Sequence, residues 1–234
     1  MTLPTPRLVT VAHGTRHPEG NDVARMISAQ AGRRLGGLPT ISTYVELCEP
    51  SFGGVMASNE HPAVVVPLLL STGHHVRHDL PSAAAGSLAP VRMARPLGPH
   101  PLLAEVMCRN LMAAGARRGD PVVMVAAGSN DPASTHDLAV AGAMLGKRWG
   151  APVRVATVGG LGRRPVDVIA GARAHGRVVI APYLLAPGHF EQRVRTIAAG
   201  LGVSVVGDII GAHSLVADLV VRRYRALAAD SLAA

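Results

Sequence analysis

The sequence is poor in aromatic residues and in cysteine, and each shortage narrows what the chain can do. It has one Trp, three Tyr and two Phe among 234 residues, which are too few to provide the stacking surfaces on which single-stranded nucleic acids bind. Its two cysteines, Cys48 and Cys108, cannot build a disulfide framework or a four-thiolate cluster. Reduced, buried thiols fit this pattern, and we expect a cytoplasmic protein.

Long hydrophobic runs are also missing. The run 63–70, proline included, has eight residues, whereas a membrane-spanning helix needs about 20. Residues 1–7 carry two prolines and lack the apolar core of a secretory signal. The sequence therefore predicts no membrane partner.

Acidic residues are few. Asp and Glu together number 15 against 23 Lys and Arg, which gives a formal charge of +8. Lys147 is the only lysine, so nearly all of this charge is carried by arginine, whose planar fork suits carboxylates and phosphates. The basic residues are dispersed and form no nucleic-acid-binding motif. We therefore expect an anionic small molecule as partner and no nucleic acid.

The chain contains an internal repeat. Three blocks recur in the same order about one half-length later, which is difficult to explain by chance. The matched blocks are 11–18 with 125–132, 64–74 with 179–189, and 97–102 with 210–215. The pattern predicts a duplicated domain whose halves are residues 1–116 and 117–234.

Each half alternates short, mostly valine-rich runs with longer amphipathic stretches. This alternation predicts βαβ units, and the nearly continuous hydrophobicity of the short runs indicates parallel strands buried on both faces. The expected fold class is α/β, with two similar doubly wound parallel-sheet halves. Expected strands are 8–12, 41–45, 64–70, 91–94, 122–126, 153–157, 178–184 and 203–206, and expected helices include 21–35, 102–114, 133–149 and 214–229.

Candidate metal-binding side chains follow the first three expected strands. His13 comes after the first strand, Glu46 and Glu49 after the second, and the adjacent His74 and His75 after the third. In a parallel sheet these positions share one edge, where ligands bind near the switch in strand order. Two imidazoles and a carboxylate suit a divalent first-row metal ion and leave coordination positions open. The sequence therefore predicts a metal site at this edge.

The second half lacks the imidazoles of the first at the matched positions. Ala127 corresponds to His13, and Phe190 corresponds to His75. This asymmetry is expected if the first half carries the metal chemistry while the second half keeps only the scaffold. Drift after duplication would also produce it.

The motif His13-Gly14, Glu46 and the segment 67–77, which reads PLLLSTGHHVR, resemble the sirohydrochlorin chelatases. These are small, ATP-independent (class II) enzymes that insert cobalt or iron into the tetrapyrrole sirohydrochlorin. The resemblance covers nearly the whole chain, including the second-half segment 182–188, and it matches the long, duplicated form of the family. It implies flavodoxin-like, chelatase-type halves, the first with the metal site and the second completing the cavity, in a monomer.

The resemblance implies roles for individual residues. His13 and His75 would be catalytic residues that bind the metal and accept protons. The family pattern Gly-x-His-Val selects His75 over His74 for this role. Glu46 fits the family's acidic ligand, although Glu49 lies close in sequence. Residues implied to bind the anionic substrate are Thr15, Arg16, Ser71, Thr72, Gly73, Arg77 and His189.

No permanently bound cofactor is implied by this resemblance. The divalent metal, Co²⁺, Fe²⁺ or Ni²⁺, would enter as a substrate, in cobalamin or sirohaem biosynthesis. Two other functions fit parts of the same pattern. A histidine phosphatase also has a histidine after its first strand, but here Ala12 stands where that class has a phosphate-binding arginine. A non-catalytic carrier of metal or tetrapyrrole would use the same site without turnover.

Overall fold

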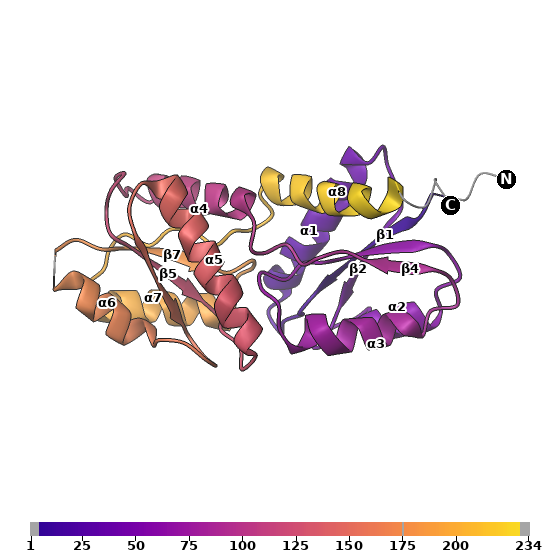
Figure 1. Cartoon of the computed structure of the whole chain (residues 1–234), viewed down its shortest axis with the longest axis horizontal. Coiled ribbons are helices and arrows are strands. Elements are labelled where there is room, and N and C mark those ends of the chain that lie inside the picture. The colour runs from indigo at the N-terminus through magenta and orange to yellow at the C-terminus, as the bar shows by residue number, and fades with distance from the viewer. Residues whose placement is uncertain (1–4, 175, 230–234) are drawn as a thin grey trace. The chain divides into compact units, whose positions relative to one another are not determined.

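The chain folds into two compact units, each built on a parallel β-sheet (Figure 1). The computed structural model describes residues 5–174 and 176–229, so the outer ends of the two predicted halves, 1–4 and 230–234, lie outside it. The first unit contains the described residues up to Leu97 together with those from Ala212 onward, and the second contains Gly98–Gly211.

The sheet of the first unit has the strand order β2-β1-β3-β4, with every neighbouring pair parallel. Helices α2 and α3 contribute Phe52, Met56 and Leu80 to the core on one face of this sheet, where they pack against the valines of β1 and β3. Helices α1 and α8 pack against β1 and β3, respectively, and against each other. The elements are β1 (Arg7–Ala12), α1 (Pro18–Arg34), β2 (Thr40–Tyr44), α2 (Phe52–Ala57), β3 (Ala63–Pro67), the π-helical turn η1 (His75–Asp79), α3 (Leu80–Ala85), β4 (Val91–Met93) and α8 (Ser214–Ala228).

The second unit repeats this plan with the strand order β6-β5-β7, again all parallel. Its core on one face joins β5 and β7 to α6 and α7, while α4 packs against α5 and β7. The elements are α4 (Pro101–Ala113), β5 (Val122–Ala126), α5 (Pro132–Trp149), β6 (Val153–Thr157), α6 (Pro165–Arg173), β7 (Val179–Tyr183) and α7 (His189–Gly200). The two sheets confirm the predicted α/β class with two similar parallel-sheet halves.

The strand predicted at 203–206 is wrong. Only Val206 pairs with the sheet, through a single bridge to Ile180. The next residue, Gly207, donates its N–H to the Ile180 carbonyl at 2.8 Å and lies close to α4, where a Cβ on Gly207 would be 3.4 Å from the backbone nitrogen of Leu111. Valine-rich sequence favours a strand here, but the pairing with β7 does not extend beyond this one bridge.

The compact units differ from the linear halves 1–116 and 117–234, because the last helix of each repeat packs on the sheet of the other. Helix α4 ends before residue 116 but lies in the second unit, and α8, near the end of the chain, lies in the first. An ion pair between Glu105 and Arg148 joins α4 to α5. The matched pair Arg34–Asp218, 3.0 Å long, joins α1 to α8. The repeat indicates which segments are duplicated but not which sheet each of these helices covers.

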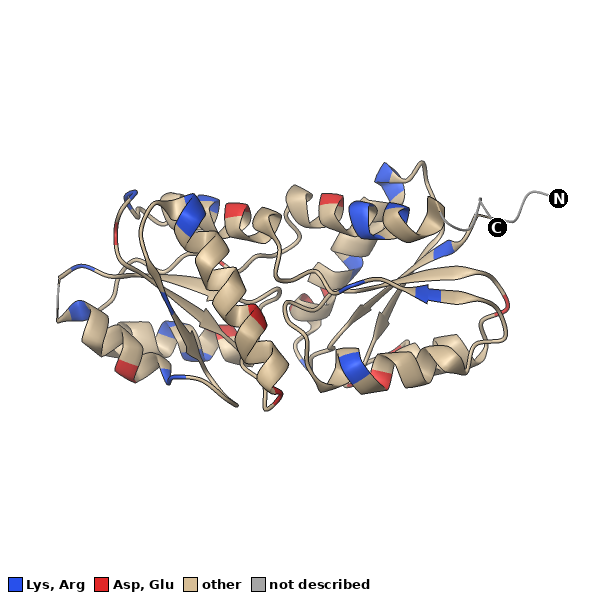
Figure 2. Ribbon diagram, viewed as in Figure 1, with Lys and Arg blue, Asp and Glu red and all other residues tan. Residues whose placement is uncertain are grey.

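The surface charge is distributed over both units. Figure 2 shows Lys and Arg interspersed with Asp and Glu along the helices and loops, and several arginines form ion pairs within one or two helical turns, such as Arg164–Asp167 and Arg195–Glu191. Among the described residues, no helix has the length and hydropathy that crossing a bilayer requires.

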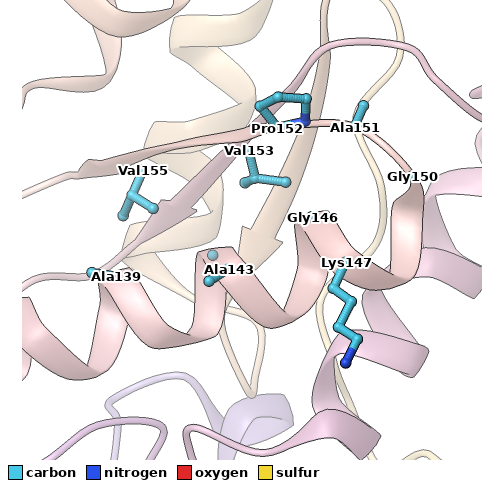
Figure 3. A pocket seen from close by; sticks show the side chains of 10 residues that line it. Ala139, Ala143, Gly146, Lys147, Gly150, Ala151, Pro152, Val153 and Val155 are labelled. Carbon is cyan, nitrogen blue, oxygen red and sulfur yellow. The ribbon is translucent and has the colours of Figure 1, made fainter.

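A hollow of about 650 Å³ lies between α5 and β6 in the second unit (Figure 3). Its lining consists mostly of glycine, alanine, valine and proline. The one ionisable group in that lining is Lys147, whose side chain extends away from the strand in Figure 3. The hollow therefore offers little to hold a polar ligand.

Candidate metal site at the carboxyl edge of the first sheet

The strand order brings three loops of the first unit together. Strand β1 lies between β2 and β3, and the chain passes from β1 to one neighbour and later to the other, which makes the carboxyl end of β1 the switch point of the sheet. His13 directly follows β1, Glu46 comes just after β2, and His75 begins η1 after β3. The sequence therefore places one donor on each of three adjacent loops.

The loops after β1 and β2 are held against each other by their backbones. The N–H groups of Val45 and Glu46 donate to the carbonyls of Ala12 and His13 at 2.9 and 3.1 Å, which extends the pairing beyond the strands. Gly14 has φ +94°, and a Cβ there would lie 1.8 Å from the Glu46 carbonyl oxygen. Only glycine fits this position, and its close approach fixes His13 beside Glu46.

The three donors converge. One possible ligand atom from each of His13, Glu46 and His75 lies within 4.8 Å of the other two. His13 Nδ1 is 3.4 Å from Glu46 Oε1, and the two imidazole rings meet edge to face with centroids 5.0 Å apart. The side chains of His13 and Glu46 are about half exposed and that of His75 is 31% exposed. The cluster is therefore open to a metal ion and to a larger ligand above it.

Glu49 does not join the cluster. Its Oε2 accepts a hydrogen bond from the Ser51 N–H at 2.5 Å, just ahead of α2. Of the two acidic residues that the sequence left open, only Glu46 lies with the histidines.

His74 also stays outside the set of three. Its side chain is 73% exposed, and its ring lies 6.5 Å from that of His75 and 4.9 Å from that of His78, measured between centroids. The adjacent His75 is the one whose ring lies against that of His13.

Asp79 is a site residue that sequence reasoning missed. Its Oδ2 lies 2.6 Å from Nδ1 of His75, one helical turn earlier, and its Oδ1 lies 3.5 Å from Nε2 of His74. The spacing His-x-x-x-Asp in the segment that follows β3 was the available signal, since residues four apart share a helix face.

Asn21 was also missed, and it anchors the loop that carries His13. Its side-chain oxygen accepts from the Thr15 N–H at 3.1 Å, and its amide donates to the Thr15 carbonyl at 2.8 Å. Asn21 is buried, and its own carbonyl accepts a hydrogen bond from the Tyr44 hydroxyl. The loop is therefore clamped to the start of α1.

The predicted substrate-binding residues occupy different places. The Thr15 hydroxyl accepts from the His17 N–H at 3.1 Å and so stabilises its own loop. Arg16 is exposed on the loop that carries His13, and Arg77 is exposed within η1. The half-buried Ser71, Thr72 and Gly73 lead into η1. His189 lies in the second unit, at the first position of α7, with its ring 5.6 Å from that of Phe190.

Fold and site together define a duplicated α/β protein with a His-Glu-His cluster at the switch point of its first sheet. The sequence matches the CbiX family twice, over residues 7–114 and 121–227. The chain belongs to this family, and the two matches follow the internal repeat.

Individual relatives agree with this assignment. The chain is 24% identical over 236 residues to a sirohydrochlorin ferrochelatase of Priestia megaterium, which covers 93% of this chain and 88% of the relative. SirB from Bacillus subtilis with Fe³⁺ has the same fold, with a TM-score of 0.83, 22% identity and 97% of both chains covered. SirB from Bacillus subtilis subspecies spizizenii in complex with cobalt aligns with a TM-score of 0.76, 21% identity and the same coverage.

Proposed function

We propose that this protein is a sirohydrochlorin chelatase that inserts a divalent metal ion into the tetrapyrrole without ATP. The observation that carries the proposal is the convergence of His13, Glu46 and His75 within 4.8 Å of one another, in a chain of the CbiX family. The Priestia megaterium relative bears the name of this activity.

The reaction requires a metal ion to replace two protons on the pyrrole nitrogens. Neutral imidazoles at His13 and His75 supply nitrogen lone pairs for the ion, and the Glu46 carboxylate offsets part of its charge. As the ring nitrogens take over the metal, an imidazole released from the ion accepts a pyrrole proton, since histidine titrates near neutral pH. Two protons leave for each metal ion inserted, so charge and atoms balance.

Arginines next to the cluster suit the anionic substrate. Arg16 follows the His13 loop, and Arg77 lies two residues after His75. Both are exposed, and guanidinium groups pair well with the peripheral carboxylates of sirohydrochlorin. A ring held above the cluster by these contacts would present its central nitrogens to the histidines.

Iron and cobalt are the metals we expect. One of the two SirB structures is of the protein with Fe³⁺ and the other is of a complex with cobalt. Two imidazoles with one carboxylate suit either metal in the divalent state. The nickel alternative has no such support. The choice between the two metals decides between sirohaem and cobalamin biosynthesis.

The test is an anaerobic absorbance assay with purified protein and sirohydrochlorin, in which Co²⁺, Fe²⁺ and Ni²⁺ are supplied in parallel without ATP. We expect the spectral change of metal insertion to be faster with Co²⁺ or Fe²⁺ than in the protein-free control. Tight binding of the ring without faster insertion would instead establish a carrier. Absence of both binding and turnover would refute the proposal and return attention to phosphatase chemistry, for which trapping of a phosphohistidine is the direct assay.

A further inference from the structure

The hydrogen bond between His75 and Asp79 determines which nitrogen of His75 can bind a metal ion. A neutral imidazole carries one N–H donor and one lone pair, on different nitrogens. Because a carboxylate can only accept, the 2.6 Å contact between Nδ1 and Oδ2 requires the proton to be on Nδ1. The lone pair is then on Nε2, the nitrogen that Asp79 does not contact.

The backbone holds both partners of this hydrogen bond in one rigid turn. His75 and Asp79 are the first and last residues of η1, and the Leu80 N–H donates to the His75 carbonyl, which closes the π-helical turn. Leu80 itself is 1% exposed and packs in the core beside Phe52 and Met56. The turn is therefore anchored to the interior directly after Asp79.

Asp79 differs from the other carboxylate near the histidines. Glu46 belongs to the cluster of possible ligands, whereas Asp79 does not. Its two oxygens face His75 Nδ1 and, at 3.5 Å, His74 Nε2. Asp79 therefore contacts the Nδ1 side of His75 and is not one of the three possible metal ligands.

The second repeat has neither the histidine nor the aspartate of this pair. At the constant offset of 115 residues, Phe190 stands for His75 and Val194 for Asp79. Val194 is buried in the core of its unit. Where the imidazole is absent the carboxylate is absent too, and the matched residues lie in the α-helix α7 instead of a π-helical turn.

We propose that Asp79 is a positioning residue that holds His75 in the Nδ1–H tautomer and orients its Nε2 toward the metal. A carboxylate behind a ligating histidine both fixes the ring and strengthens its lone-pair donation. The inference rests on the proposed function in one respect, that His75 is a metal ligand. It assigns to Asp79 no contact with the metal or the tetrapyrrole.

The test compares Asp79→Ala, Asp79→Asn and Asp79→Glu with the wild type and with Asp167→Asn. Asp167 is a matched control because its carboxylate is 49% exposed against 43% for Asp79 and forms its ion pair with Arg164 in the second unit. Long-range ¹H–¹⁵N spectra of the metal-free proteins at about pH 8, where imidazole is neutral, report the tautomer of His75. The His75 signals are assigned from their loss in His75→Gln. Co²⁺ titrations followed by visible absorbance report metal affinity.

We expect the wild type and Asp167→Asn to show the Nδ1–H tautomer and equal Co²⁺ affinity. Asp79→Ala should lose that tautomer preference, and Asp79→Asn should reverse it, since an amide can donate to Nδ1. Both should bind Co²⁺ about 10- to 100-fold more weakly. Asp79→Glu, which keeps the carboxylate on the same helix face, should recover part of the affinity and the tautomer.

An unchanged His75 tautomer in Asp79→Ala and Asp79→Asn would overturn the proposal, even if metal affinity falls, because the residue would then act only through the fold. Unchanged Co²⁺ affinity in both variants would overturn it as well. Failure of the wild type to insert metal into sirohydrochlorin would refute the proposed function alone, since tautomer and Co²⁺ affinity are measured without the tetrapyrrole.

Discussion

The carboxyl edges of the two sheets have the same backbone and different side chains. Gly14 and Gly128 have φ values of +94° and +93°, and a Cβ on either would lie 1.8 Å from the carbonyl oxygen of Glu46 or Gly159. The Glu46 N–H donates to the His13 carbonyl at 3.1 Å, and the Gly159 N–H donates to the Ala127 carbonyl at 2.9 Å. The tight loop therefore belongs to the scaffold and does not depend on the metal site.

At these matched positions, only the first unit has side chains that could bind a metal ion. His13, Glu46 and His75 are replaced in the second unit by Ala127, Gly159 and Phe190, and none of the three replacements can bind a metal ion. The difference shows that the duplicated fold needs neither the imidazoles nor the carboxylate for its stability. It supports a chemical role for the three donors.

Removing a ligand from the first unit should have the largest effect. We expect His13→Ala and His75→Ala each to lower the rate of metal insertion by about 100-fold or more, since each removes a side chain to which the proposed function assigns metal binding and proton acceptance. Circular dichroism should be unchanged, because the second unit folds without these side chains. His189→Ala should cause a smaller loss, and His61→Ala, an exposed residue outside the site, should cause none. Wild-type turnover in either ligand variant would remove that residue from the site.

Restoring ligands to the second unit would test the comparison in the opposite direction. The triple variant Ala127→His, Gly159→Glu, Phe190→His should bind an additional equivalent of Co²⁺. Position 159 accepts a side chain, since a Cβ there would meet only the Ala127 carbonyl oxygen, at 3.8 Å. The new site should be about 10- to 100-fold weaker than the native one, because Val194 supplies no carboxylate behind the new histidine.

Metal titration of this triple variant in a His13→Ala, His75→Ala background isolates the new site. A protein that folds normally and binds no Co²⁺ there would mean that the two edges differ in more than their side chains.

Substitution of the matched glycines Gly14 and Gly128 distinguishes an effect on stability from an effect on metal binding. Gly14→Ala and Gly128→Ala should each lower the free energy of unfolding by about 2 kcal/mol or more, because both force a Cβ into a strained backbone position against a carbonyl oxygen. Denaturant unfolding measures this loss. Only Gly14→Ala should also weaken Co²⁺ binding, since it displaces the His13 and Glu46 loops. Equal metal affinity in the two variants would argue that the close approach does not position the donors.

The smallest expected effect concerns the ion pairs of α4 and α8, the exchanged helices, each of which packs on the sheet of the other repeat. Glu105 is mostly buried, and its hydrogen bond from Arg109, together with Arg148, lowers the pKa of this carboxyl below its usual value. Its contribution is therefore present above about pH 4.5 and is lost as pH falls through the lowered pKa. Glu105→Gln should cost about 1 kcal/mol at neutral pH and less in acid.

The matched residue in the first unit gives a control for this prediction. Asp218 pairs with Arg34 but is 41% exposed, against 16% for Glu105, so Asp218→Asn should cost less because water screens the pair. Thermal unfolding of both variants between pH 3 and pH 7 makes the comparison. A cost for Glu105→Gln that does not shrink in acid would contradict the role assigned to its charge.

The sequence predicts the parts of this molecule that depend on local pattern. Alternation of valine-rich runs and amphipathic stretches indicated two parallel-sheet halves, and the positions of His13, Glu46 and His75 after successive strands indicated their convergence. The first prediction follows because parallel strands that are buried on both faces are almost continuously hydrophobic. The second follows because the carboxyl ends of parallel strands lie at the same edge of the sheet.

Features set by packing across long sequence distances could not be read in this way. The exchange of α4 and α8 depends on which sheet each helix meets, and the two helices have similar sequence patterns. The two helices even begin in the same way, because His100 and His213 cap them through equivalent hydrogen bonds. In each, Nδ1 accepts from the N–H two residues later, at 3.2 and 3.1 Å. The choice between Glu46 and Glu49 also needed the structure, in which Glu46 lies with the histidines while Glu49 accepts a hydrogen bond from the Ser51 N–H.

The exchange of helices has a consequence for the order in which the chain is made. The second unit is one continuous segment, whereas the first is discontinuous and includes α8 near the carboxyl end. A ribosome releases the chain from its amino end, and compact units fold as they become complete. The sheet that carries His13, Glu46 and His75 is synthesised first, yet its helical cover is finished only when α8 emerges. The unit with the His-Glu-His cluster is therefore the first whose synthesis begins and the last to be completed.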